Sequence, residues 1–365
     1  MKILFVTGIF PPEIGGPATA IAEAAKQMKS QGHEVTVLTY GKSTEETAEC
    51  LRVSRDGSLV QRYLAMRDQI LLHLTPETLV VATDLASVGV PTRLALVGKP
   101  NRLVLRLGGE WLWEDAILHN DVQMSLRTFW SSPPRRLSFR LKRWMASWVL
   151  RRAQKIIVTS GLLGEMLPKI ASPLQAQITV LQNVERVSSP VQRPSEEPHR
   201  PFRVIYVGRF APVKNVPFFA RVLRSLIDEG AQISCRFIGD GPDRSAIEST
   251  LQGVSGIEFL GSVAQPRVRE LMADSDLLVL PSYTDISPNV VFEALGCNLP
   301  CLITSENGLP SGLGGVVLVS PTDAEEWKQQ LRALLEPKAY AQLRDAMYVP
   351  DAKTSSSFAE EVLRV

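Results

Sequence analysis

The chain has 365 residues, of which 45% are hydrophobic, and a formal net charge of +2. This length is too great for one ordinary hydrophobic core and predicts two domains. The nearly neutral charge argues against a nucleic-acid-binding protein that relies on bulk charge. The first residues lack the long apolar run and cleavage site of a signal peptide, and no run of about 18 uncharged apolar residues predicts a spanning helix. We therefore expect a cytoplasmic protein whose cysteines are reduced and buried.

Apolar runs alternate with helical patterns through the first half of the chain. A buried strand at 2–7, a loop with Gly15 and Gly16, a helix at 18–29 and a strand at 33–39 predict a right-handed βαβ unit. The loop lacks the G-x-G-x-x-G pattern, which argues against a dinucleotide-dependent dehydrogenase. The alternation continues with helices at 59–74, 86–97 and 160–170 and strands at 78–82, 102–107, 155–159 and 178–181.

Glu110 follows the strand at 102–107, within the stretch Gly108 to Glu114 that also holds two tryptophans. Ligands bind at the carboxyl ends of the strands in open α/β sheets. Glu110 and the tryptophans are therefore expected to face a sugar, and Glu110 is a candidate catalytic residue. The alternative interpretation is a turn at the end of a strand with two aromatic core residues.

The stretch 124–155 carries many basic residues, three tryptophans and no acidic residue. Arg140, Trp144 and Trp148 are spaced by four, so they share one face of a helix. A basic helix with tryptophan on its surface is typical of proteins that lie on an anionic membrane, which indicates peripheral membrane contact at the inner face. Two other interpretations stay open, namely a solvated basic face and tryptophans that pack into the core.

The stretch 187–201 is rich in Pro, Ser and charge without periodicity, which is typical of a linker. We therefore predict a first domain at 1–186, a second domain at 202–350 and a final segment at 351–365 that crosses back to the first domain. The predicted fold is α/β, with two doubly wound domains that face each other across a cleft. The second domain alternates strands at 202–207, 231–238, 256–260, 276–280 and 300–304 with helices at 215–229, 242–252, 265–273 and 289–296.

Ligand-binding residues are expected where three strands of the second domain end. Arg209 and Lys214 follow the strand at 202–207, where the Arg fork and the Lys point charge would neutralise a diphosphate. A tight turn of Gly239, Asp240 and Gly241 follows the strand at 231–238. Each signal is weak alone, but their order on successive strands of one domain is specific.

The third strand end leads into the short helix at 289–296. Ser287 is a favoured N-cap, and Pro288 suits the first helical position because its missing N–H has no partner there anyway. The N–H groups of Asn289 and Val290 would then hold an anion at the start of the helix.

Asp285 lies just before this helix and Glu293 lies within it, so that a ligand at the helix start would contact both. An acidic residue, seven others and then Glu resembles the E-x7-E motif of the retaining glycosyltransferases of family four, which have the GT-B fold. The stretch from Gly296 to Thr304 is similar to that family's Ala-x-Gly-x-Pro-Val tail. The chain departs from the motif at its first acid, which is Asp285 instead of Glu.

The resemblance extends over nearly the whole chain. Gly208 to Lys214 is similar to the family's Gly-Arg-x…Lys-Gly motif, with Asn215 in place of the second Gly. Gly239 to Gly241 resembles its nucleobase-side turn, and Gly15 with Gly16 resembles the N-terminal loop that approaches the donor. The family's histidine near the donor sugar has no counterpart after Glu110.

The resemblance implies transfer of a sugar, with retention at the anomeric carbon, from a nucleotide-diphosphate sugar to a glycan, lipid-linked or small-molecule acceptor. Neither a metal nor a further cofactor is expected. The implied roles are as follows: Arg209 and Lys214 hold the diphosphate, Glu293 binds the ribose hydroxyls, Asp285, Ile286 and Ser287 grip the transferred sugar, and Asn289 and Val290 bind the distal phosphate.

Two alternatives keep the donor site but change the outcome. A nucleotide-sugar 2-epimerase of the same fold would release free epimerised sugar without an acceptor. A catalytically inactive nucleotide-sugar-binding protein, suggested by Asp285 and the missing histidine, would bind the donor without turnover.

Overall fold

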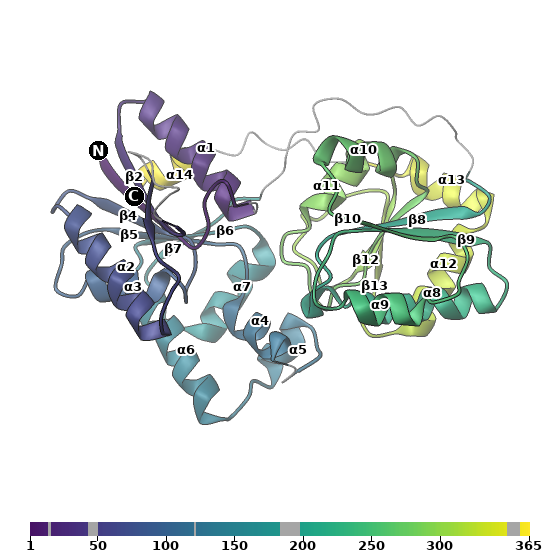
Figure 1. Cartoon of the computed structure of the whole chain (residues 1–365), viewed down its shortest axis with the longest axis horizontal. Helices are drawn as coiled ribbons and strands as arrows, with labels where there is room; N and C mark the ends of the chain where they lie inside the picture. The colour runs from purple at the N-terminus through teal and green to yellow at the C-terminus, as the bar shows by residue number, and fades with distance from the viewer. Residues whose placement is uncertain (14–15, 43–49, 120–121, 183–197, 349–357) are drawn as a thin grey trace. The chain divides into compact units, whose positions relative to one another are not determined.

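The computed structural model describes residues 1–13, 16–42, 50–119, 122–182, 198–348 and 358–365 (Figure 1). Contacts within the chain divide it into two compact units. The first unit comprises Met1–Leu112, Pro133–Gln182 and 358–365, and the second comprises Trp113–Ser132 and 198–348. The second unit includes Trp113–Ser132, which lies within the predicted first domain, and the domain boundaries themselves stay a prediction.

The first unit is built on a 7-stranded parallel sheet with the order β3-β2-β1-β4-β5-β6-β7. Most of its strands are continuous apolar runs because helices cover both faces of a parallel sheet. The strands β1 and β2 start in register, with Lys2 opposite Glu34, whereas β3 starts at Cys50 opposite Val37 of β2. The strands are β1 Lys2–Thr7, β2 Glu34–Tyr40, β3 Cys50–Val53, β4 Leu79–Ala82, β5 Leu103–Leu107, β6 Lys155–Val158 and β7 Gln177–Val180.

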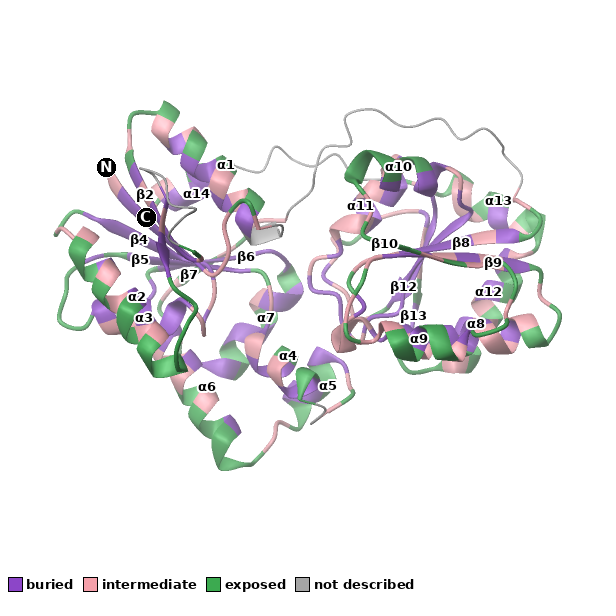
Figure 2. Ribbon diagram, viewed as in Figure 1, coloured by how far each residue is buried: buried purple, intermediate pink, exposed green. Residues whose placement is uncertain are grey.

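The helices of the first unit connect these strands and bury one face each. In α6, for example, Phe139, Ala146 and Val149 point into the core while the opposite side of the helix is exposed (Figure 2). The helices are α1 Gly16–Ser30, α2 Leu59–His73, α3 Gly89–Ala95, α6 Leu137–Leu150 and α7 Gly161–Ile170.

The last described helix, α14 Phe358–Leu363, belongs to the first unit. Its Ala359 and Val362 are buried in the same apolar cluster as Phe5 of β1. A buried ion pair adds to this packing, because Lys155 Nζ lies 2.7 Å from Glu361 Oε2 and also donates to the Glu361 carbonyl. Breaking one partner of such a pair leaves an uncompensated buried charge, so the pair ties the end of the chain to β6.

The second unit is built on a 6-stranded parallel sheet with the order β10-β9-β8-β11-β12-β13. The first strand, β8, lies between β9 and β11, so the strand order reverses there, as in doubly wound folds that bind nucleotides at this point. The strands are β8 Phe202–Val207, β9 Ile233–Ile238, β10 Ile257–Gly261, β11 Leu277–Leu280, β12 Cys301–Thr304 and β13 Val316–Val319.

The helices of the second unit pack on this sheet around Trp327, Tyr340 and the apolar strands. They are α8 Val216–Asp228, α9 Arg244–Thr250, α10 Gln265–Ala273, α11 Asn289–Gly296, α12 Ala324–Leu334 and α13 Pro337–Asp345, with a single turn η2 at Pro212–Lys214. Two helices earlier in the chain, α4 Trp111–Leu118 and α5 Leu126–Ser131, lie mainly or wholly within Trp113–Ser132.

The doubly wound α/β fold expected from the sequence is confirmed, and most predicted elements agree with the structure within a few residues. The strands β3 and β13 and the helices α4, α5, α12 and α13 were not predicted from the sequence. All four cysteines are buried, as expected. No helix in the described part of the chain is both long and apolar enough to cross a membrane.

Candidate functional site

The predicted donor-binding residues of the second unit lie where β8, β9 and β11 end. These strands and β12 are neighbours in the sheet, and all of them are parallel. The loops after their carboxyl ends therefore lie along one edge, next to the point where the strand order reverses. This edge is the usual ligand site of open α/β sheets.

Glycine allows the loops after β8 and β9 to pack backbone against backbone. A Cβ atom on Gly239 would lie 2.0 Å from the carbonyl oxygen of Gly208, and one on Gly241 would lie 2.4 Å from that of Phe210. Hydrogen bonds of 2.9 Å from Phe210 N to Asp240 O and 3.0 Å from Asp243 N to Phe210 O join the two loops. The structure thus brings the first two predicted motifs together.

Lys214 and Asp285, which the sequence placed in different motifs, form an ion pair. Lys214 Nζ lies 2.7 Å from Asp285 Oδ2, and Ser282 Oγ lies 3.3 Å from the same oxygen. Asp285 is only 4% exposed, so its charge requires such partners. The pair places a cation and a carboxylate side by side between the loops after β8 and β11.

The backbone of Asp285 is held by the loop after β12. Its N–H donates to the Glu306 carbonyl at 2.9 Å, and its own carbonyl accepts from Gly308 N–H at 2.9 Å. Asp285 and Asn307 form an isolated parallel bridge. The loop before α11 is therefore fixed to the loop after β12, which sets the direction of the Asp285 side chain.

Tyr206, in β8 and just upstream of Gly208, was not singled out from the sequence. Its hydroxyl donates to the Arg209 carbonyl at 2.9 Å. Burial, reinforced by the charge of Asp285, raises the pKa of Tyr206 well above its usual range, so the phenol stays protonated as a donor. No signal in the sequence pointed to Tyr206, because a tyrosine within a buried apolar strand is interpreted as an ordinary core residue.

Asn215 takes the place of the second glycine in the Arg–Lys motif. Its φ of 51° lies in the left-handed region, which Asn tolerates better than other residues with side chains. Its amide donates to the Pro321 carbonyl at 3.0 Å. The substitution therefore keeps the backbone conformation that positions Lys214 just before it. Arg209, at the start of the same loop, is exposed.

The start of α11 differs from the expectation by one residue. The N-cap is Pro288, not Ser287, and no side chain caps the helix. The Ser287 hydroxyl donates to the Asn289 side-chain oxygen at 3.2 Å, and the Asn289 N–H donates to the Ser287 carbonyl at 2.9 Å. One of the two N–H groups predicted to bind phosphate is thus already engaged, which leaves Val290 as the stronger candidate.

Further residues of the predicted set lie around these loops. Ile286 is buried next to Asp285. Glu293 in α11 accepts a hydrogen bond of 2.7 Å from Gln265 Nε2, at the start of α10. The exposed Asp240 bonds the N–H of Gly241 at 2.7 Å and pairs with Arg244 at 3.3 Å. These contacts do not test the donor-binding roles of Ile286, Glu293 and Asp240, which stay predictions.

The candidates of the first unit are less well defined. Gly15 lies outside the described residues, and Gly16 is the first residue of α1. The loop before them is held by Arg55, which pairs with Glu13 at 2.7 Å and donates to the Gly8 carbonyl at 3.1 Å. That arginine was not singled out from the sequence.

Glu110 was expected to face a sugar, but the structure gives it a contact within the chain. It is 1% exposed, and its Oε1 accepts from Leu112 N–H at 3.3 Å in the first turn of α4. Of the two tryptophans that the alternative interpretation placed in the core, Trp113 is buried and Trp111 is half-buried. The Trp113 indole donates to the Met124 carbonyl at 2.9 Å. A catalytic role for Glu110 stays a prediction.

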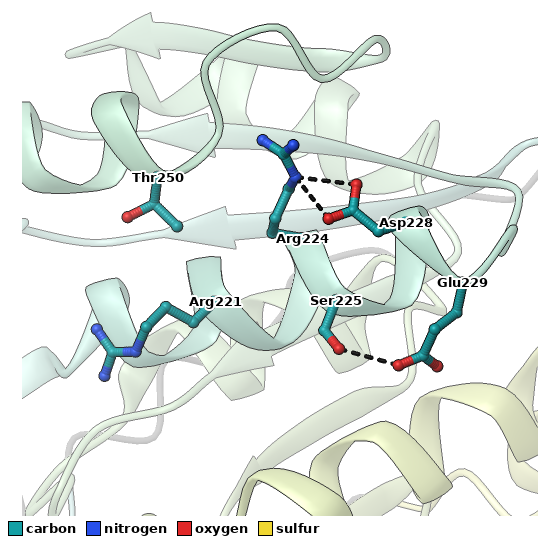
Figure 3. A pocket seen from close by; sticks show the side chains of 6 residues that line it. All are labelled: Arg221, Arg224, Ser225, Asp228, Glu229 and Thr250. Carbon is teal, nitrogen blue, oxygen red and sulfur yellow. Dashed lines mark hydrogen bonds and ion pairs between the residues drawn. The ribbon is translucent and has the colours of Figure 1, made fainter.

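A surface hollow of about 380 Å³ lies on α8 and the end of α9, and none of its six lining residues is a predicted site residue (Figure 3). Its polar groups bond to each other, with Arg224 Nε 2.8 Å from Asp228 Oδ2 and Ser225 Oγ 2.9 Å from Glu229 Oε1. We do not assign it a ligand. In the described part of the chain, no three His, Cys, Asp or Glu side chains gather as a metal site.

Two doubly wound parallel sheets in separate units are the architecture of the GT-B glycosyltransferases. Sucrose-phosphate synthase from Thermosynechococcus elongatus shares this fold, with a TM-score of 0.72, 16% sequence identity and coverage of 94% of this chain and 92% of that chain. Residues 201–337 match the family model of glycosyl transferases group 1, and residues 15–183 match that of the glycosyl transferase 4-like domain. The chain therefore belongs to the group 1 glycosyltransferases of family four.

Curated relatives are similar to parts of the chain. The teichuronic acid biosynthesis glycosyltransferase TuaC of Bacillus subtilis is 28% identical over 181 residues, which is 47% of this chain and 44% of the relative. The sulfoquinovosyl transferase SQD2 of Arabidopsis thaliana is 30% identical over 149 residues, which is 39% of this chain and 28% of the relative. The matched region spans less than half the length of these relatives.

Proposed function

We propose that the protein transfers a sugar from a nucleotide-diphosphate sugar to an acceptor, with retention at the anomeric carbon. The observation that carries the proposal is the Lys214–Asp285 ion pair at the switch point of the second sheet, where Lys214 follows the same strand as Arg209. Cations bind a diphosphate, whereas hydrogen-bond acceptors such as carboxylates bind the hydroxyl groups of a sugar. Lys214 and Asp285 supply one group of each kind, 2.7 Å apart.

In the proposed complex, Arg209 and Lys214 hold the donor diphosphate. The Lys214 ammonium has three N–H donors, and one of them donates to Asp285. Lys214 can therefore bind a phosphate oxygen while its ion pair with Asp285 stays intact. The positive charges stabilise the diphosphate as it leaves with the electrons of the broken anomeric bond. Placed charges of this kind supply the largest part of the rate in such reactions.

The carboxylates bind hydroxyl groups in this proposal. Asp285, with the Ile286 and Ser287 backbone, accepts hydrogen bonds from the transferred sugar, and Glu293 accepts them from the ribose. The turn from Gly239 to Gly241 lies next to the Gly208 loop, which suits close approach of a nucleobase to the backbone. Two cations and the start of α11 do the neutralising, so the proposal requires neither a metal nor a further cofactor.

We propose a glycan or a lipid-linked sugar as the acceptor. Support comes from the similarity to TuaC, a glycosyltransferase of teichuronic acid biosynthesis. Location in the cytoplasm remains the expectation from the sequence.

The first test is a thermal-shift panel of UDP, GDP, ADP and TDP. A diphosphate that binds only the native chain at about 100 times its Kd adds roughly 2.7 kcal/mol to its stability. We expect one nucleotide to raise the melting temperature by several degrees, with the corresponding monophosphate as the control. No shift with any of the four would contradict the donor site.

The second test follows the products of the matching nucleotide sugar. We expect nucleoside diphosphate to be released quickly only with an acceptor, and the new bond to keep the anomeric configuration. Free epimerised sugar would point to an epimerase, and binding without turnover to an inactive protein. Either result would refute the transferase proposal.

Glu293→Ala is expected to weaken nucleotide binding about tenfold, because a carboxylate that accepts hydrogen bonds from hydroxyls contributes about 1.5 kcal/mol or more. Isothermal titration with the nucleoside diphosphate measures the change. Glu293 also bonds Gln265, so Gln265→Ala is the matched control and should leave affinity unchanged. Equal affinity of Glu293→Ala and the wild type would refute the ribose role.

A further inference from the structure

Helix α6 carries a row of apolar side chains on the side that faces away from its own core. Leu137, Leu141 and Trp144 are 79%, 56% and 61% exposed. Their spacing of four and three residues places them on one face, opposite the buried Phe139 and Ala146. An ordinary surface helix is polar on this side, so the apolar row requires an explanation outside the core of this unit.

The apolar row is held in a fixed arrangement. The rings of Trp144 and Trp148 stack in parallel, with centroids 6.2 Å apart and planes 8° apart. The guanidinium of Arg93, in α3, lies 4.4 Å from the centroid of Trp148 on α6. Rings that are ordered in this way lose little freedom when their outer face is covered.

The charge around the row is positive. Arg135, Arg140 and Arg151 are exposed at or beside α6, and the sequence from 124 to 155 has no acidic residue. Of the helices with the most contacts to α6 in the described chain, α3 has no carboxylate and α7 has one, Glu165. A partner that covers the apolar row therefore also contacts the arginines along the edges of that row.

We propose that this face of α6 lies on an anionic lipid membrane, with the leucines and Trp144 at the level of the headgroups and the arginines on the lipid phosphates. Tryptophan and arginine suit this interface, because the ring and the aliphatic stem enter the apolar layer while the polar tip stays in water. A second copy of the chain fits less well, since a twofold contact would bring the same arginines together. The proposal does not depend on sugar transfer.

Vesicle binding by the 365-residue chain tests the proposal. We expect sedimentation with vesicles of phosphatidylcholine mixed with phosphatidylglycerol, and much weaker sedimentation with phosphatidylcholine alone. The double variant Leu141→Gln, Trp144→Gln should lower the partition coefficient tenfold or more, because two exposed apolar side chains no longer enter the lipid. Arg135→Gln with Arg140→Gln should lower it more than tenfold, at about fivefold for each charge, and added salt should reproduce that loss.

Leu318→Gln and Lys338→Gln are the matched controls, because both residues are exposed and lie in the second unit. They should bind vesicles like the wild type. Unchanged binding of the α6 variants, equal binding to neutral vesicles, or self-association in light scattering that only the α6 variants lose would each overturn the proposal. The substituted side chains are exposed, so circular dichroism should confirm that the variants stay folded.

Discussion

Arg209→Ala and Lys214→Ala are each expected to reduce sugar transfer by about 10²–10³-fold, because each removes a charge that would stabilise the leaving diphosphate. Arg209 is exposed, so its variant should keep the stability of the wild type. Lys214→Ala leaves the buried Asp285 without its cation and should also lower stability. The measurement is the release of nucleoside diphosphate with the donor and acceptor that the wild type uses.

The matched control for the loss of a positive charge is Lys338→Ala. This lysine is exposed in α13 of the same unit, away from the predicted loops. Its variant should turn over at the wild-type rate. Wild-type rates in both Arg209→Ala and Lys214→Ala would remove the basis of the phosphate assignment, whatever the fold.

Gly239→Ala is expected to destabilise the second unit by about 2–6 kcal/mol. The new Cβ atom would lie 2.0 Å from the Gly208 carbonyl oxygen, and the φ of +127° is unfavourable for a residue with a side chain. A backbone clash and a strained dihedral each cost about 1–3 kcal/mol. The midpoint of urea unfolding measures the effect, and nucleotide binding should weaken because the two loops must separate.

Gly253→Ala separates the two contributions. Gly253 has a φ of +76° but no atom within 4 Å of a Cβ built on it, so its variant bears the dihedral cost alone. We expect it to unfold at a midpoint between those of the wild type and Gly239→Ala. Equal destabilisation by both alanines would show that the close approach of the loops after β8 and β9 is not what requires glycine at position 239.

The departures from the family motif are compatible with the local geometry. Asn215 adopts the left-handed conformation that its glycine counterpart would supply. Asp285 reaches Lys214 at 2.7 Å because hydrogen bonds from the loop after β12 hold its backbone. The argument for an inactive protein rested on Asp285 and the missing histidine, and the turnover experiment decides it.

Local pattern was sufficient for much of this protein. Apolar runs such as those of β8 and β11 predict buried parallel strands, because both faces of such a sheet are covered. Glycine, arginine and lysine at successive strand ends pointed to one edge of the second sheet. Short or solvent-facing elements such as β3, β13 and α5 were missed, because they show neither a long apolar run nor a clear helical period.

The contacts between distant residues required the tertiary structure. The sequence by itself determined the two α/β sheets, the family resemblance and a set of candidate residues, since these depend on periodicity and on residue type. Only the structure decided that Lys214 pairs with Asp285, that Glu110 caps a helix and that Leu141 and Trp144 face outward. Such outcomes depend on which side chains meet across strands and helices, and spacing along the chain does not encode that choice locally.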